Sequence, residues 1–137
     1  MSLNVQAVEE SFAHIKPHAA EFASKFYCIL FQDNPEIKPL FANTNIVEQE
    51  KKLLQTLVLV VQNLRTSTYL NNILQDLGER HVRYGTLEAH YPIVGAALLK
   101  TLEFYLGESW TPEVKQAWID AYGAIVSIML RGAKRPE

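Results

Sequence analysis

Hydrophobic residues recur at intervals of three and four along nearly the whole chain, and no segment alternates strictly between apolar and polar positions. A repeat of three to four residues is typical of amphipathic helices, whereas alternation is typical of strands. Val8, Phe12 and Ile15 share one face in this way and predict a helix over Val5–Ile15, which Pro17 should end or bend sharply. The pattern therefore predicts an all-α protein.

Five further helices follow, separated by local stop signals. Pro35 and Pro39 stand only four residues apart and leave room for one short helical turn between the second and third helices. Thr111 followed by Pro112 is a typical start for the last helix. The five predicted helices cover residues 17–31, 46–64, a segment capped by Ser67 or Thr68 and ending before Gly85, residues 88–106, and residues 112 to about 131.

Composition and charge narrow the class of protein. A chain of 137 residues with 48% hydrophobic residues can bury one core, so we expect a single domain over residues 1–137, with 131–137 as a flexible tail. The net charge of −2 gives no reason to expect nucleic-acid binding. The sequence has no run of 18 apolar residues and no N-terminal signal-peptide pattern. We therefore expect a cytoplasmic protein without a membrane span. Cys28, the only cysteine, is interpreted as a small core residue.

The segment "DLGERHVRYG" holds the best candidate for a metal ligand. His81 continues the apolar stripe of Tyr69, Ile73 and Leu77, so its ring should face the interior. The Leu77 carbonyl, one turn earlier, could accept the Nδ1 proton and thereby fix the tautomer that ligates a metal. The alternative is a histidine that only interacts with the helix dipole.

The other three histidines, His14, His18 and His90, are interpreted as structural or solvated residues. The chain contains no histidine or carboxylate pattern typical of zinc or di-iron sites.

Five segments stand in an order and spacing that resemble one known family: "FYCILFQDNPEIKPLF", "EQEKKLL", "LGERHVRYG", "HYPIVGAALL" and "AWIDAYG". The chain resembles the single-domain bacterial globins, which are akin to the haem domain of flavohaemoglobins, from "VEESFAHI" to "AWIDAYGAIVSIML". The resemblance implies a globin fold with six to eight helices around a haem pocket.

Carried over by position, the resemblance implies that His81 is the proximal ligand of haem iron and that Phe41 packs flat against the porphyrin. Tyr27 matches the distal tyrosine, Gln49 the distal-helix position often filled by histidine, and Leu53 the apolar residue over the iron. Phe41 and Leu53 would be buried in any helical core. Tyr27 and Gln49 are more informative, because a buried hydroxyl or amide needs a polar partner.

Further residues are expected around the haem. Leu77 matches the residue whose carbonyl orients the proximal ring, Tyr91 matches a proximal tyrosine, and Val94 is a further apolar contact. A glutamate of the flavohaemoglobin proximal network would fall at or near Ala133, where this chain has no carboxylate, so the proximal imidazole should donate less charge to iron. The expected propionate partners are Lys52, Arg80, Arg83 and Tyr84.

Three functions remain open. The first is a haem b protein that reversibly binds O2, NO and CO at a pentacoordinate or water-ligated iron, for storage, scavenging or sensing. The second is a nitric oxide dioxygenase that produces nitrate and depends on an external reductase, because the sequence contains no GxGxxG motif for a flavin or nicotinamide module. The third is a haem-free interaction or light-harvesting domain, for which Cys28 would be a poorly placed attachment site.

Overall fold

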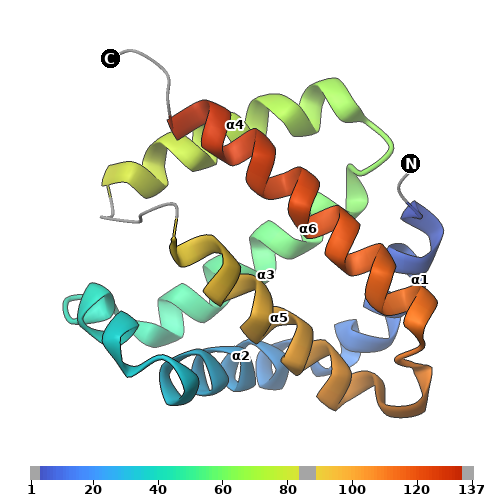
Figure 1. Ribbon diagram of the computed structural model, residues 1–137, viewed down its shortest axis with the longest axis horizontal. Helices are drawn as coiled ribbons and strands as arrows, with labels where there is room; N and C mark the ends of the chain where they lie inside the picture. The colour runs from blue at the N-terminus through green and yellow to red at the C-terminus, as the bar shows by residue number, and fades with distance from the viewer. Residues whose placement is uncertain (1–3, 84–88, 134–137) are drawn as a thin grey trace.

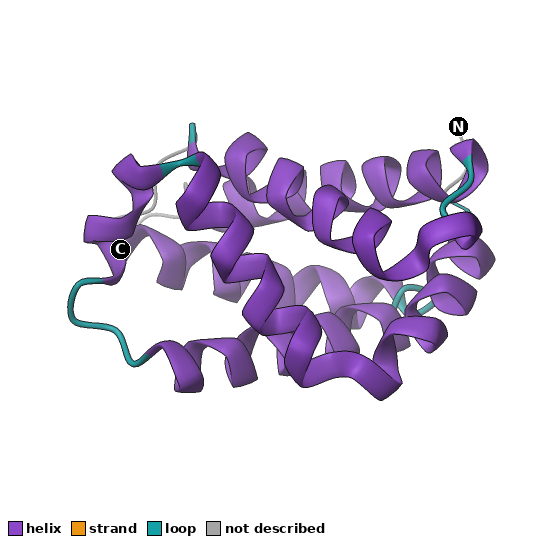
Figure 2. Ribbon diagram, turned by 90° about the horizontal axis from the view of Figure 1, so that it is seen from below, coloured by secondary structure: helices purple, strands orange, loops and turns teal. Residues whose placement is uncertain are grey.

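The computed structural model describes residues 4–83 and 89–133, apart from the side chains at positions 67, 82, 83 and 133, and all its regular elements within these ranges are helical. The prediction of an all-α protein is thus confirmed (Figures 1 and 2). In chain order the elements are α1 (Val5–Ile15), η1 (Lys16–His18), α2 (Ala19–Asp33), η2 (Pro35–Phe41), α3 (Ile46–Gln62), α4 (Ser67–Arg83), α5 (His90–Leu106), η3 (Gly107–Ser109) and α6 (Pro112–Ala133).

Local sequence signals set several helix ends. The side chains of Asn4 and Asn45 accept hydrogen bonds from backbone N–H groups in the first turns of α1 and α3. The Thr111 hydroxyl likewise accepts the N–H of Val114, at 3.2 Å, as expected for the start of α6. Gly107 has a φ of 52°, a left-handed conformation that favours glycine, and it ends α5.

The helix boundaries differ from the predicted ones by a few residues. A 3₁₀ turn around Pro17 delays the start of α2 to Ala19, and α3 ends at Gln62 rather than Leu64. The last helix continues to Ala133, and residues 134–137 of the expected tail lie outside the described residues. Gly85, the expected break before α5, also lies outside them.

Helix α6 crosses the molecule and packs against α1, α4 and α5 (Figure 1). Its most extensive contacts are with α4. Two buried clusters form the core. The first joins α1, α2, α5 and α6 and includes Phe22, Leu30, Leu102 and Trp118; the second joins α3, α4, α5 and α6 and includes Val60, Leu70, Leu74, Tyr91 and Met129.

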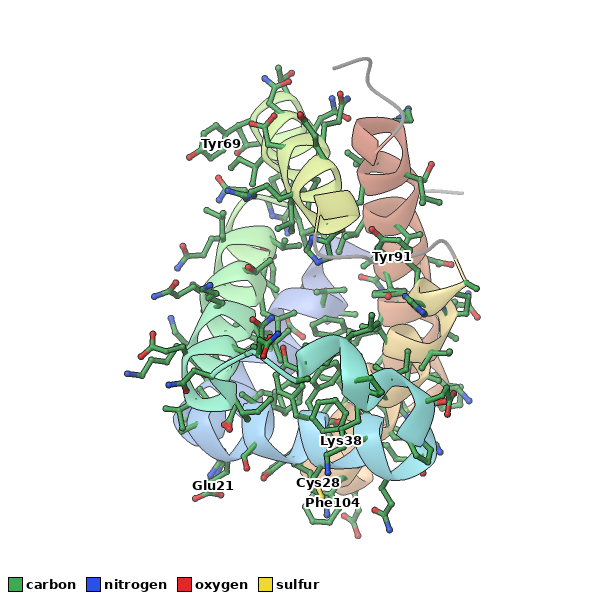
Figure 3. All side chains as sticks on the ribbon, turned by 90° about the vertical axis from the view of Figure 1, so that its left-hand side faces the viewer. Glu21, Cys28, Lys38, Tyr69, Tyr91 and Phe104 are labelled. Atoms are coloured by element: carbon green, nitrogen blue, oxygen red, sulfur yellow. The ribbon has the colours of Figure 1, made fainter. Side chains whose placement is uncertain are left out.

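Two sequence-based predictions of burial are wrong. Cys28 is exposed on the outer side of α2, because one step along a helix turns the side chain by about 100° away from the buried Tyr27 (Figure 3). Tyr69 is 53% exposed on the outer side of α4, and Leu70 and Leu74 are buried in the second core instead. Among the described residues, no helix is both long and apolar enough to cross a membrane.

Candidate functional site

His81 lies near the C-terminal end of α4, with its Nδ1 atom 2.8 Å from the carbonyl oxygen of Leu77. This is the hydrogen bond expected from the helical spacing. Burial lowers the pKa of His81 more than hydrogen bonding to Leu77 raises it, and the charge of Arg80 lowers it further. The imidazole is therefore neutral at pH 7. A neutral ring that donates through Nδ1 carries its lone pair on Nε2, the form that ligates metals.

Tyr91 lies beside this histidine, in the first turn of α5. The two rings are nearly parallel, with centroids 6.5 Å apart and an interplanar angle of 27°. Tyr91 is itself held by α6, because the hydroxyl of Tyr122 donates a 2.6 Å hydrogen bond to the Tyr91 carbonyl oxygen. Burial strongly raises the pKa of Tyr122, which keeps this donor protonated. His81, Leu77 and Tyr91 thus form one group of site residues.

Tyr27 is the centre of a second group, built on α2 and η2. It is 5% exposed, and aromatic rings surround it. The ring centroid of Phe41, at the end of η2, is 5.9 Å from that of Tyr27, and the two rings meet edge to face. Phe26 and Phe31 also contact Tyr27, at centroid distances of 4.9 and 6.0 Å. The packing leaves the Tyr27 ring little freedom to reorient.

Gln49, in the first turns of α3, supplies the polar partner of Tyr27. Burial raises the pKa of Tyr27, side-chain hydrogen bonding by Gln49 acts to lower it, and the charge of Glu50 raises it. A hydrogen bond that lowers the pKa of a phenol is one donated to its oxygen, because such a bond stabilises the phenolate. The net effect is a raised pKa, which keeps Tyr27 protonated at neutral pH, so its hydroxyl can act as a hydrogen-bond donor.

Apolar side chains at the edges of the two cores complete the candidate site. Phe41, Leu53 and Val94 pack against the first core and Leu77 against the second, yet each is only half-buried. Half-buried apolar side chains can cover a flat apolar group. Together with a neutral imidazole that ligates metals and a phenol–amide pair that forms hydrogen bonds, these residues fit a haem group by their chemistry.

The expected propionate partners are less well defined. Lys52 on α3 and Arg80 on α4 are both exposed, so their side chains are accessible to an anionic group. Tyr84 and the side chain of Arg83 lie outside the described residues.

In the described ranges, no cluster of three or more His, Cys, Asp or Glu side chains suits a metal ion. His14 and His18 are exposed, and His18 stacks on Tyr105 at a centroid distance of 6.2 Å. His90 is half-buried at the start of α5. A shallow depression on the outer side of α2, lined by Glu21, Cys28 and Tyr105 among others, contains none of the expected site residues.

Two features of the site are missed by inspection of the sequence. Tyr122 belongs to the "AWIDAYG" segment, but nothing in its spacing indicates a hydrogen bond to Tyr91. The Tyr122 ring also lies against Gly95, where an added Cβ would come within 2.6 Å of the ring. A half-buried tyrosine opposite a glycine is recognisable only once the two helices are placed together.

Comparison with known proteins identifies the family of the chain. The Globin family model matches residues 24–129. The chain is 31% identical to a flavohemoprotein of Bacillus subtilis (strain 168), over 92% of this chain and 32% of that protein. It is also 31% identical to anaerobic nitrite reductase HBII of Casuarina glauca, over 88% of this chain and 84% of that protein.

The similarity extends to solved structures. A bacterial globin from Campylobacter jejuni is 28% identical and superimposes with a TM-score of 0.81, over 95% of this chain and 94% of that one. The resemblance to flavohaemoglobins expected from the five sequence segments is confirmed, although the chain spans only about a third of the length of the flavohemoproteins it matches. By family model, sequence and fold, the chain belongs to the globin family.

Proposed function

We propose that this globin holds haem through His81 and reversibly binds O2, NO and CO. The observation that carries the proposal is the hydrogen bond from Nδ1 of His81 to the Leu77 carbonyl, because it orients the ring and leaves Nε2 as the ligating atom. Globin family membership implies the haem. When bound, the haem iron supplies an open or water-ligated coordination position for a diatomic ligand.

The residues of the chain then have separate tasks. Phe41, Leu53, Leu77 and Val94 cover the apolar faces of the group, and the exposed cations Lys52 and Arg80 pair with its propionates. Tyr84 remains an expected propionate partner. Haem type b is supported by the position of Cys28, since the only cysteine lies exposed on the outer side of α2 and is poorly placed for covalent attachment.

Tyr27 and Gln49 determine how long O2 is held. The Tyr27 hydroxyl would donate a hydrogen bond to a ligand on the haem, and Gln49, whose side chain interacts with Tyr27, would hold that hydroxyl in place. Bound O2 carries more negative charge than bound CO, so the hydrogen bond favours O2, by about 1.5–3 kcal/mol. The chain binds these gases in the cytoplasm for storage, scavenging or sensing.

A nitric oxide dioxygenase is the second candidate, and the similarity to flavohemoproteins favours it. In this reading the globin domain would hold haem and O2, and a reductase, which we propose to be a separate protein, would supply the electrons for repeated turnover.

Haem ligation is tested by the absorption spectrum of purified or haem-reconstituted protein. We expect a Soret band in the wild type, its loss or displacement in His81→Ala, and no change in His14→Ala, in which an exposed histidine is removed as a matched control. An unchanged Soret band in His81→Ala would exclude His81 as the ligand.

A further inference from the structure

Two glycines bring the backbones of α4 and α6 into direct contact beside the candidate haem ligand. A Cβ atom added at Gly78 would overlap the carbonyl group of Met129, and one added at Gly132 would overlap the carbonyl group of Gln75. The two contacts are reciprocal, since each helix contributes one glycine and one carbonyl. Figure 1 shows the C-terminal half of α6 beside α4.

These contacts lie on the part of α4 that holds His81. Gly78 directly follows Leu77, whose carbonyl accepts the hydrogen bond from Nδ1 of His81. His81 itself comes three residues after Gly78, roughly 60° away around the helix axis. The face of α4 that presents Gly78 to α6 is thus adjacent to the face that presents the imidazole.

The contacts are made by backbone atoms, which distinguishes them from ordinary side-chain packing. Side chains adjust to a change by changing rotamer, but a backbone carbonyl within a helix moves only with its helix. Any side chain at position 78 or 132 would therefore separate α4 from α6 and displace the Leu77 carbonyl.

We propose that Gly78 and Gly132 are positioning residues, which make α6 the rigid support that sets the place and orientation of the His81 ring. The inference rests on the proposed function, because it concerns the same histidine. Position 132 has no room for any side chain while the two helices stay in contact.

Alanine substitutions test the proposal, with Gly123→Ala as the matched control. Gly123 lies on the same helix α6, but a Cβ there would meet no atom within 4 Å. The readouts are the iron–histidine stretching band of the ferrous protein in resonance Raman spectra and the rate of haem loss to a haem-scavenging protein.

We expect Gly78→Ala and Gly132→Ala to shift or broaden the iron–histidine band and to speed haem loss roughly 10- to 100-fold, the range typical of residues that orient a metal ligand. Gly123→Ala should match the wild type in both readouts. If Gly78→Ala and Gly132→Ala lower the melting temperature but keep the wild-type band and rate, the two glycines have only a structural role and the proposal is wrong.

A second measurement on the wild type applies if the variants fail to fold. In native-state hydrogen exchange of the apoprotein, amides of residues 75–81 and 129–132 should open together with one common free energy. Independent opening of the two segments would contradict the proposal. A wild type that shows no iron–histidine band would instead reject haem ligation by His81 itself, so the two failures are distinguishable.

Discussion

At the scale of single residues, the proposed function assigns to Tyr27 the most direct contribution to ligand affinity. Its ring is fixed by Phe26, Phe31 and Phe41, and its hydroxyl interacts with Gln49. We predict that Tyr27→Phe increases the O2 dissociation rate about 10- to 100-fold, because one hydrogen bond of about 1.5–3 kcal/mol is lost. CO dissociation should change much less. Stopped-flow ligand replacement measures both rates, and equal effects on O2 and CO would argue against a hydrogen bond.

The raised pKa of Tyr27 predicts how this effect depends on pH. A tyrosine with a pKa above its ordinary value of 10.0 remains protonated at every lower pH, so it stays a donor. The O2 dissociation rate of the wild type should therefore be constant from about pH 6 to about pH 9. A rise in that rate within this range, absent from Tyr27→Phe, would show that the hydroxyl ionises earlier than its burial implies.

Gln49 should act through Tyr27. We expect Gln49→Leu to increase the O2 dissociation rate less than Tyr27→Phe does, because the hydroxyl remains but is held less firmly. In the double variant the second change should add little, since both remove parts of one network. Fully additive effects on the activation free energy would mean that Gln49 contacts the ligand independently.

At the scale of helices, local signals were sufficient to predict several ends but not every buried face. Pro17, Gly107 and Thr111 act within one turn of the chain, so their effects are visible in the sequence. In α4 the apolar residues form two neighbouring stripes. Only tertiary packing decides that Leu70 is buried against α6 and that Tyr69 is exposed.

In α4, too, contacts within one helix can be predicted from the sequence, whereas contacts between helices cannot. Spacing alone predicts the hydrogen bond to Leu77, because donor and acceptor lie one turn apart on one helix. The backbone contact of Gly78 with Met129 joins residues about fifty positions apart. Nothing in "LGERH" reveals it, since glycine has no side chain whose periodicity could be followed.

Gly107 provides a test of helix termination. Its φ of 52° is strained for any residue with a side chain, so Gly107→Ala should lower the free energy of unfolding by about 1–2 kcal/mol. Gly123→Ala, at an exposed and open position within α6, should raise it by up to about 1 kcal/mol, because alanine favours helix. Urea unfolding followed by circular dichroism measures both. If both substitutions changed the free energy of unfolding equally, the positive φ of Gly107 would not be the reason for a glycine at that position.

At the scale of the whole molecule, the site depends on residues that no single segment contains. Tyr27 comes from α2, Gln49 from α3, His81 from α4 and Tyr91 from α5. Each is ambiguous alone, and within the sequence only their order along the chain indicates a common pocket. The supporting role of α6, through Tyr122 and Gly132, emerged only from the packed helices.

The reaction with nitric oxide separates ligand binding from catalysis at this scale. Repeated turnover consumes electrons, which a globin domain that only holds haem and O2 does not supply without a reductase. We expect the ferrous, O2-loaded protein to consume NO once, in proportion to its bound O2, and then to stop. Adding NADH and a flavin-dependent reductase should restore consumption at a rate that rises with the reductase concentration. An NO electrode measures both phases, with Tyr27→Phe as the variant that holds less O2.

Sustained NO consumption by the isolated chain without any reductant would contradict the need for a reductase partner. If NO consumption does not resume after the reductase is added, reversible gas binding is favoured over the dioxygenase.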